Sequence, residues 1–276
     1  MALIINHNAA SGNAMNNLSK TQRSLSQAFS RISSGLRINS AADDAAGLAM
    51  SENMDSEARS LRQAQRNTHD GISVIQTAEG ATQEVSDIIK RMRELATQSS
   101  SETLANTERS YIQDEFSELS KEVDRIANVT EFNGVALANG TTASLNVQVG
   151  ANNTADDRIA ITLGNLKATQ LKVDTGNISL GTAASAQSAL STLDKALGTV
   201  NASRSKYGAV QNRLESALNN LETYTSNIAS AASNIRDADF AHETAELAKF
   251  QIMQQAGVSI LGQANGLNSG ALRLIG

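Results

Sequence analysis

The sequence contains no cysteine, no proline and no tryptophan among its 276 residues. Without cysteine there is no disulfide, no thiolate metal site and no cysteine nucleophile. Average usage of about 5% predicts on the order of a dozen prolines in a chain of this length. Because proline breaks helices, its absence favours long, uninterrupted helices. Aromatic residues make up only 3% of the chain, so the core must be aliphatic and rich in alanine.

Charge and hydropathy make two classes of function improbable. The net charge of −5 argues against nucleic-acid binding, which needs a clustered basic surface. No run approaches the roughly 18 consecutive apolar residues of a membrane span, so we expect no membrane insertion. The apolar residues 1–5 form a short run without a preceding basic residue, and we therefore expect no cleavable secretory signal.

Apolar residues recur every three or four positions over long stretches, which predicts helices. The predicted helices cover residues 15–36, 41–98, 112–126, 193–235 and 247–274. The clearest stripe in the second helix is Ile72, Ile75, Ala78, Thr82, Val85, Ile89, Met92 and Ala96. A capping box formed by Ser40 and Asp43 predicts where that helix starts. The heptad spacing of the C-terminal stripes is typical of helices that pack lengthwise, as in a coiled coil.

Only the middle of the chain departs from this pattern. Residues 144–150 and 158–163 alternate apolar and polar side chains, and a polar, turn-prone segment joins them. Asn133-Gly134 and Asn139-Gly140 are further turn signals. Residues 132–181 are therefore predicted to form a small insert that contains a β-hairpin.

The length of the second helix indicates the shape of the molecule. About 58 helical residues extend roughly 87 Å, whereas a compact globule of this chain length has a diameter of roughly 50 Å. We predict a mainly α fold, namely a long antiparallel helical rod with coiled-coil terminal helices and a small β-hairpin insert. The expected domains are a terminal helical assembly domain (1–40 and 236–276), a helical rod domain (41–131 and 182–235) and the hairpin part (132–181).

The terminal stripes have little globular mass to bury them. Isolated amphipathic helices of this kind are marginal in water, so they must pair with each other or with other copies of the chain. We expect an assembling subunit. The candidate assembly residues are Leu18, Leu25, Phe29, Ile32, Phe250, Ile260 and Leu267.

Signatures of catalysis are poor. The three histidines are far apart in sequence, and His242-Glu243 begins the helical zinc-protease motif but has Glu246 where the second histidine would fall. No phosphate-binding glycine loop occurs. We predict no enzyme activity, no catalytic residue, no metal site and no cofactor.

A second line of residues lies beside the core stripe near the end of the long second helix. An apolar pair with a guanidinium between them indicates another packing surface, because arginine is favoured at interfaces. Two interpretations remain open, a contact with another helix of the same chain and a contact between subunits. The line consists of Ile88, Arg91 and Leu95.

Several longer motifs occur in order at both ends of the chain. In the N-terminal half they are RISSGLRINSAADDAAG (31–47), NTHDGIS (67–73), RMRELATQ (91–98) and EFNG (131–134). In the C-terminal half they are GAVQNR (208–213), IRDADFA (235–241) and QIMQQAG (251–257). The chain resembles bacterial flagellin in these motifs over nearly its whole length, and it resembles a short form without outer variable domains.

The resemblance implies a structural subunit that self-assembles into the extracellular helical flagellar filament and serves motility. It implies export through the flagellar type III apparatus, with an export chaperone on the C-terminal helix. The other implied partners are copies of the chain itself, the flagellar cap and the hook-junction proteins.

The resemblance also implies recognition of the monomer by the vertebrate Toll-like flagellin receptor. The positions that match the recognised motif are Arg91, Leu95 and Glu115. Two alternative functions are a hook–filament junction protein, which usually lacks the 91–98 and 131–134 motifs together, and a cytosolic coiled-coil scaffold, which fits the heptads but not the ordered motifs.

Overall fold

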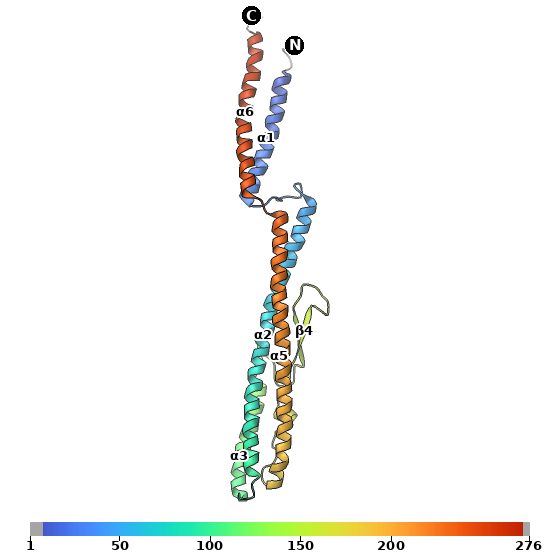
Figure 1. Ribbon diagram of the computed structural model, residues 1–276, viewed down its shortest axis with the longest axis vertical. Coiled ribbons are helices and arrows are strands. Elements are labelled where there is room, and N and C mark those ends of the chain that lie inside the picture. Colours follow the sequence, from blue (N-terminus) through green and yellow to red (C-terminus); the bar gives the residue numbers. More distant parts are fainter. Residues whose placement is uncertain (1–7, 273–276) are drawn as a thin grey trace. The chain divides into compact units, whose positions relative to one another are not determined.

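Long helices dominate the computed structural model, which describes residues 8–272 and the side chains of residues 8–266. The mainly α fold predicted from the sequence is confirmed (Figure 1). The helices are α1 (Ala9–Ser34), α2 (Ala45–Ser99), α3 (Asn106–Val129), α4 (Ala168–Leu171), α5 (Ala183–Arg236) and α6 (Phe240–Leu272). The strands are β1 (Glu131–Phe132), β2 (Val135–Ala136), β3 (Ser144–Gln148) and β4 (Arg158–Thr162).

The chain divides into two compact units. We call residues 1–57 with 227–276 the terminal unit, and residues 58–226 the middle unit. The dividing points lie inside α2 and α5, whereas the domain boundaries predicted from the sequence follow helix ends near residues 40 and 236. Those domain boundaries, and the rod shape as a whole, stay predictions.

In the terminal unit, α1 and α6 lie side by side and antiparallel (Figure 1). The side chain of Asn8 caps α1 by accepting a hydrogen bond from the Ser11 N–H at 3.0 Å, and its amide donates to the Ala264 carbonyl of α6 at 3.0 Å. At the other end α1 stops at Gly35, whose φ of +72° is the left-handed conformation that glycine tolerates.

The start of the second helix differs from the prediction by four residues. Ser40 does not cap a helix here, because the Asp43 carboxylate turns back and accepts from the N–H groups of Asn39 and Ser40. The helix begins at Ala45 instead, and the Asp44 carboxylate caps it by accepting from the Gly47 N–H at 2.9 Å. The two adjacent carboxylates therefore have different roles: Asp43 holds the connecting loop and Asp44 caps α2.

In the middle unit, α2 and α5 run antiparallel and bury the predicted stripes. Arg93 of α2 pairs with Asp194 of α5 at 2.7 Å, while Gln65 of α2 donates to Thr225 of α5. One core joins α2, α3, α5 and the segment before α5, and its largest members are Ile89, Met92, Leu95, Phe116, Leu166, Leu180 and Leu193. A second core joins α2 and α5 to the strands, and includes Ile75, Leu137, Ile161, Tyr207 and Leu214.

The predicted hairpin is confirmed as β3 and β4, which pair antiparallel from Ser144↔Thr162 to Gln148↔Arg158. Alternate residues of β4, Ile159 and Ile161, are buried. A smaller pair, β1 with β2, closes at Asn133 and Gly134, which have φ of +49° and +77°. Positive φ at both positions is what a tight hairpin turn requires, and Asn-Gly provides it with little strain.

The end of α2 depends on a side chain of α3 that no local pattern marks as important. Arg109 of α3 is buried and donates to three backbone carbonyls, those of Ser99, Ser101 and Leu104, at 3.0, 2.5 and 2.7 Å. Carbonyls at a helix C-terminus have no partner within the helix and carry partial negative charge. The guanidinium satisfies one of these, the Ser99 carbonyl, and its hydrogen bonds to the Ser101 and Leu104 carbonyls fix the loop between α2 and α3.

Gly71 lets the hairpin approach α2 closely, and this generates a prediction with an internal control. A Cβ at Gly71 would lie 2.9 Å from Cγ2 of Val147 on β3, whereas a Cβ at exposed Gly80 would meet no atom within 4 Å. Gly71→Ala should lower the free energy of unfolding by about 1 kcal/mol, because overpacking outweighs the gain in helix propensity. Gly80→Ala should raise it by up to about 1 kcal/mol. Urea unfolding followed by circular dichroism measures both, and equal signs would contradict the close-approach argument.

Tyr207 gives a prediction that depends on pH. Its hydroxyl is buried and accepts a hydrogen bond from the Gly164 N–H at 2.9 Å, and burial raises the pKa of its phenol. Because the folded chain holds this proton more tightly than the unfolded chain, the stability contributed is present below the unfolded pKa of about 10 and is lost as pH rises through the folded pKa.

The Tyr207→Phe substitution tests this arrangement. It should remove the component of highest pH from the 295 nm absorbance titration of the folded protein. At neutral pH it should also lower the free energy of unfolding by about 1–3 kcal/mol, since the Gly164 N–H loses its acceptor. If the component of highest pH persisted in Tyr207→Phe, another tyrosine would be responsible for it.

Candidate functional site

Large apolar side chains that remain exposed gather in the terminal unit. Those in the part of this unit that the structure describes are Met15, Phe29, Met50, Phe240, Ile252, Met253, Val258 and Ile260. Its buried apolar side chains in the same described part are few and mostly small, namely Ala28, Ile38, Ile228 and Ala264. The terminal unit therefore has almost no apolar core of its own, in contrast to the middle unit.

Helix α6 carries its apolar residues on all sides instead of on one face. Ile252 is 66% exposed, Val258 56% and Ile260 56%, and these three positions point in different directions around the helix. Residues 250–272 contain no Asp, Glu, Lys or Arg. A helix that is hydrophobic all round is normally buried on all sides, and α1 covers only one side of α6.

An apolar groove of about 260 Å³ runs between α1 and α6. Gly257 lines this groove, and a Cβ added there would lie 3.2 Å from Cδ1 of Leu18. Its lining has no charged side chain and consists of Ala14, Asn17, Leu18, Thr21, Met253, Ala256, Gly257 and Ile260. Depletion of charge together with exposed apolar area is the composition of the centre of a protein–protein interface.

The candidate assembly residues do not share one environment. Phe29, at 65% exposure, and Ile260 are open to solvent in the single chain. Leu18, Leu25, Ile32 and Phe250 are half-buried. The side chain of Leu267 lies outside the described residues. Whether these side chains contact another copy of the chain stays a prediction.

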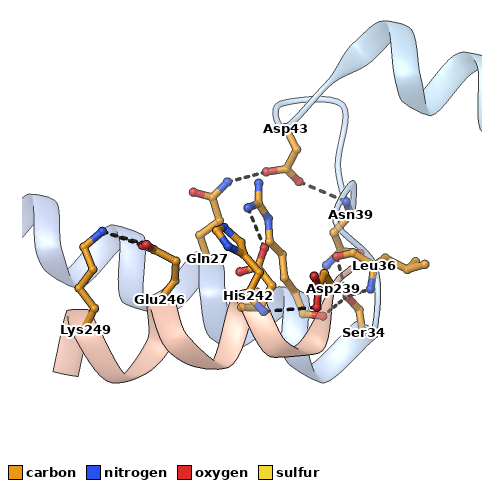
Figure 2. Close-up of polar contacts among 11 residues, drawn as sticks. Gln27, Ser34, Leu36, Asn39, Asp43, Asp239, His242, Glu246 and Lys249 are labelled. Carbon is orange, nitrogen blue, oxygen red and sulfur yellow. Dashed lines mark hydrogen bonds and ion pairs between the residues drawn. The ribbon is translucent and has the colours of Figure 1, made fainter. Parts of the chain in front are cut away.

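The end of the α1–α6 pair nearest the connecting loops is polar (Figure 2). Arg31 Nη1 of α1 lies 3.2 Å from Oε1 of Glu243 on α6, and the Glu243 side chain is only 7% exposed. Gln27 of α1 donates to the Asp43 carboxylate at 2.9 Å. The N–H of Ser40 lowers the pKa of Asp43, so this carboxylate stays charged and holds the loop 39–43 against α1.

The two connections of the terminal unit also bind each other. Arg37 N–H donates to the Arg236 carbonyl at 2.7 Å, and Ala238 N–H donates to the Gly35 carbonyl at 2.9 Å. The Arg37 guanidinium adds a hydrogen bond of 2.6 Å to the Ile235 carbonyl, one of the last in α5. The chain segments that leave α1 and enter α6 are therefore joined to each other by backbone pairing.

The line Ile88, Arg91 and Leu95 turns toward α3 of the same chain. Arg91 Nη2 pairs with Glu115 of α3 at 2.9 Å, and its Nη1 pairs with Glu94 at 2.9 Å. Leu95 is only 1% exposed and belongs to the first core, against which Ile88 also packs. Of the two interpretations left open above, the contact within one chain is thus observed. The burial of Leu95 against α3 agrees with the packing surface expected from the sequence.

Arg91 and Glu115 remain accessible at this place. Their side chains are 50% and 46% exposed, so the predicted recognition residues divide into two exposed, paired charges and one buried leucine. Within residues 8–272, no group of His, Asp or Glu side chains is arranged to hold a metal ion. Nor does any helix in that range have the length and apolarity to cross a membrane.

Sequence reasoning missed the Arg31–Glu243 pair and Arg109. The two partners of the first are 212 positions apart, and no local spacing connects them. Arg109 resembles any other cation on a helix until its carbonyl partners are known. Both residues make contacts that depend on how distant segments pack.

Comparison with known proteins gives consistent matches. Residues 5–143 match the bacterial flagellin N-terminal helical region, and residues 190–275 match the bacterial flagellin C-terminal helical region. A flagellin of Halalkalibacterium halodurans is 43% identical over 99% of this chain and 100% of its own length. The flagellar filament core protein flaB2 of Brachyspira hyodysenteriae is 42% identical over 99% of this chain and 100% of its own length.

Two solved structures are similar in fold. The crystal structure of Bacillus cereus flagellin is 31% identical, covers 60% of this chain and 94% of its own, and has a TM-score of 0.50. A putative flagellar hook-associated protein from Vibrio parahaemolyticus has a TM-score of 0.58 over 71% of this chain and 100% of its own, at 16% identity. The second likeness concerns the fold alone.

Proposed function

The chain belongs to the bacterial flagellin family and is a structural subunit of the flagellar filament, and we propose that α1 and α6 are the helices through which its copies polymerise. The observation that supports this proposal is the absence of Asp, Glu, Lys and Arg from residues 250–272 of α6, together with the exposure of Ile252, Val258 and Ile260 on different sides of the helix. In a single chain such a helix leaves apolar area in water, and neighbouring copies would remove it.

The proposed contact residues follow from that reasoning. Phe29 and Ile260 are exposed apolar side chains in the single chain and would be buried by a neighbouring copy. Leu18, Leu25, Ile32 and Phe250 are half-buried in the single chain and are proposed as further contact residues, as is Leu267, whose side chain lies outside the described residues. The apolar groove at Leu18 and Gly257 is the place where a neighbouring helix would lie most closely.

Substitution of Ile260 tests the proposal on the full chain. Ile260→Asp should raise the concentration needed for seeded polymerisation by at least about tenfold, since burying an unpaired carboxylate costs well over the 1.4 kcal/mol that a factor of ten represents. Ile260→Leu keeps the apolar surface and should polymerise like the parent. Sedimentation and negative-stain microscopy measure the polymer, and circular dichroism checks that helix content is unchanged.

The two outcomes separate cleanly because Ile260 is exposed in the single chain. An Asp there leaves the folded monomer intact, so a loss of polymer reports on contacts between copies. Polymerisation of Ile260→Asp at the parent concentration would remove α6 from the interface and leave the family's filament function untouched.

We further propose the partners and location that accompany this role in the family. The chain would be exported through the flagellar type III apparatus, with a chaperone covering the C-terminal helix until export. Outside the cell it would add to the filament below the cap and beyond the hook-junction proteins. The exposed apolar side chains in the part of α6 without charged residues (250–272) support a chaperone, because such a surface also associates with other proteins before assembly. A purely structural role without catalysis completes the proposal.

Recognition of the monomer by the vertebrate Toll-like flagellin receptor is proposed at Arg91 and Glu115. Both side chains are about half-exposed and form one paired, charged site on neighbouring helices α2 and α3. Leu95 lies in the core beneath them and would act by positioning α2. The support is the match of all three positions to the motif that the receptor recognises in the family.

Arg91→Asp places a carboxylate beside those of Glu94 and Glu115 and should weaken receptor binding by purified monomer by at least about tenfold, given the cost of like charges at an interface. Lys121→Asp is the matched control, since Lys121 is an exposed cation of α3 that pairs only with Glu118 of its own helix. Binding can be measured with the immobilised receptor ectodomain. Equal affinity of both variants would argue against the proposed site.

A further inference from the structure

The methionine thioethers are the most easily oxidised groups of this chain, because the sequence has no cysteine and no tryptophan. Its six methionines are distributed unevenly between the two units. Met92, the methionine of the middle unit, is fully buried in the first core. The other five belong to the terminal unit, at positions 1, 15, 50, 54 and 253. Oxidisable sulfur is therefore concentrated in the unit that we propose to assemble.

Met253 differs from the other exposed methionines of the terminal unit in its position. Met15 and Met50 are exposed but do not line the apolar groove between α1 and α6. Met253 lines that groove, one turn of α6 before Gly257 and two turns before Ile260. Its side chain is 46% exposed, so a small oxidant reaches it with α1 in place. Separation of the two helices would expose it further, and the thioether is accessible in the unassembled chain in either case.

A peroxide converts an accessible thioether to a sulfoxide. A lone pair of the sulfur attacks one peroxide oxygen and the O–O bond breaks. With hydrogen peroxide, the second oxygen leaves as water. The sulfur loses two electrons and the peroxide gains them, so the step needs no other co-reactant. An apolar side chain is thereby replaced by a polar one in the groove.

A sulfoxide at Met253 would find few hydrogen-bond donors once the groove is covered. The polar side chains of the lining are Asn17 and Thr21, and the Thr21 hydroxyl already donates to the Asn17 carbonyl at 3.0 Å. A helix of a neighbouring copy seated on the groove would remove the sulfoxide oxygen from water with the Asn17 amide as the remaining donor of the lining. Burying a polar group with incomplete hydrogen bonding is unfavourable, so the oxidised chain should polymerise less readily.

We propose that Met253 is a reversible oxidation site that controls polymerisation, and that its sulfoxide keeps a neighbouring copy from covering the groove. This inference rests on the proposed role of α1 and α6 in assembly. Met92 is enclosed, so the same oxidant leaves the core of the middle unit unmodified. In the polymer, the neighbouring copy shields the thioether, and the chain is sensitive before it is incorporated. Methionine sulfoxide reductases return the sulfoxide to the thioether and restore assembly.

Oxidation of the dilute, unpolymerised full chain with hydrogen peroxide tests this site. Catalase removes the peroxide, and mass spectrometry of proteolytic peptides should then locate an added oxygen on Met253 but not on Met92. The concentration needed for seeded polymerisation should rise by at least about tenfold, which corresponds to 1.4 kcal/mol. Reduction by the two methionine sulfoxide reductases, one for each sulfoxide epimer, should reverse the rise. Circular dichroism checks that helix content is unchanged.

Two leucine variants assign the effect to one residue, and each is compared with itself before and after peroxide. Met253→Leu removes the sulfur from the groove, and its seeded polymerisation concentration should change by less than about twofold on oxidation. Met50→Leu is the matched control, since Met50 is also exposed but lies outside the groove lining. It should show the same rise as the parent. A rise in Met253→Leu as large as that of the parent would overturn the proposal.

Oxidation of the preformed polymer gives a second, independent readout. The rate at which Met253 gains oxygen should fall by at least about tenfold relative to the unpolymerised chain, because a packed interface excludes the oxidant. Equal rates in the two states would also overturn the proposal. Ile260→Asp separates the two levels of the inference. If that variant polymerises at the parent concentration, the proposed role of α6 fails and the Met253 proposal fails with it. If it is impaired while the oxidised parent polymerises normally, the Met253 proposal alone is wrong.

Discussion

Burial of α6 is the constraint on which the rest of the terminal unit depends. Its residues 250–272 carry no charge and its apolar side chains point in all directions, yet a single neighbour, α1, covers it in the chain. The other features of the unit are related to this incomplete burial. The groove at Gly257 leaves apolar surface of α1 and α6 exposed, and the Arg31–Glu243 pair joins the two helices at the end nearest the connecting loops.

The middle unit solves the opposite problem. Its two cores bury large side chains such as Phe116 and Leu193 within the chain, so it has no unmet requirement of the same kind. The connection between α2 and α3 is held by Arg109, which donates to the Ser99 carbonyl at the end of α2 and to the Ser101 and Leu104 carbonyls of the loop. The middle unit thus buries its large apolar side chains within the chain, whereas the terminal unit leaves many of them exposed. This division suits a subunit whose family function is to build a filament.

Local periodicity made much of this fold predictable. The apolar stripe of α2 is buried where the spacing placed it, with Ile75, Val85 and Ile89 fully enclosed, and the alternation in β3 and β4 gave a correct hairpin. The predicted start of the second helix was wrong, because a single tertiary contact outweighs the local sequence pattern there. The Ser40–Asp43 motif satisfied a capping rule, but the loop used Asp43 for its own amides and Gln27, so α2 starts later.

Leu95 also shows that local spacing does not determine which helix covers a residue. Spacing shows that its position lies off the main stripe, but only the docking of α3 determines that this second face is covered. The candidate site was predictable in outline, because apolar terminal helices with little to cover them are visible in the sequence. Its polar details join residues far apart in the chain and have no local signature.

The separation of those partners along the chain has a kinetic meaning. Arg31 and Glu243 are 212 positions apart, whereas the contacts of α2 with α3 and those within the hairpins close short loops. Closing a longer loop costs more conformational entropy and comes later in folding. We therefore expect α1 and α6 to meet after those shorter loops have closed. Before they meet, the apolar side chains of each helix can contact other molecules. The chain is therefore most prone to premature association during that time.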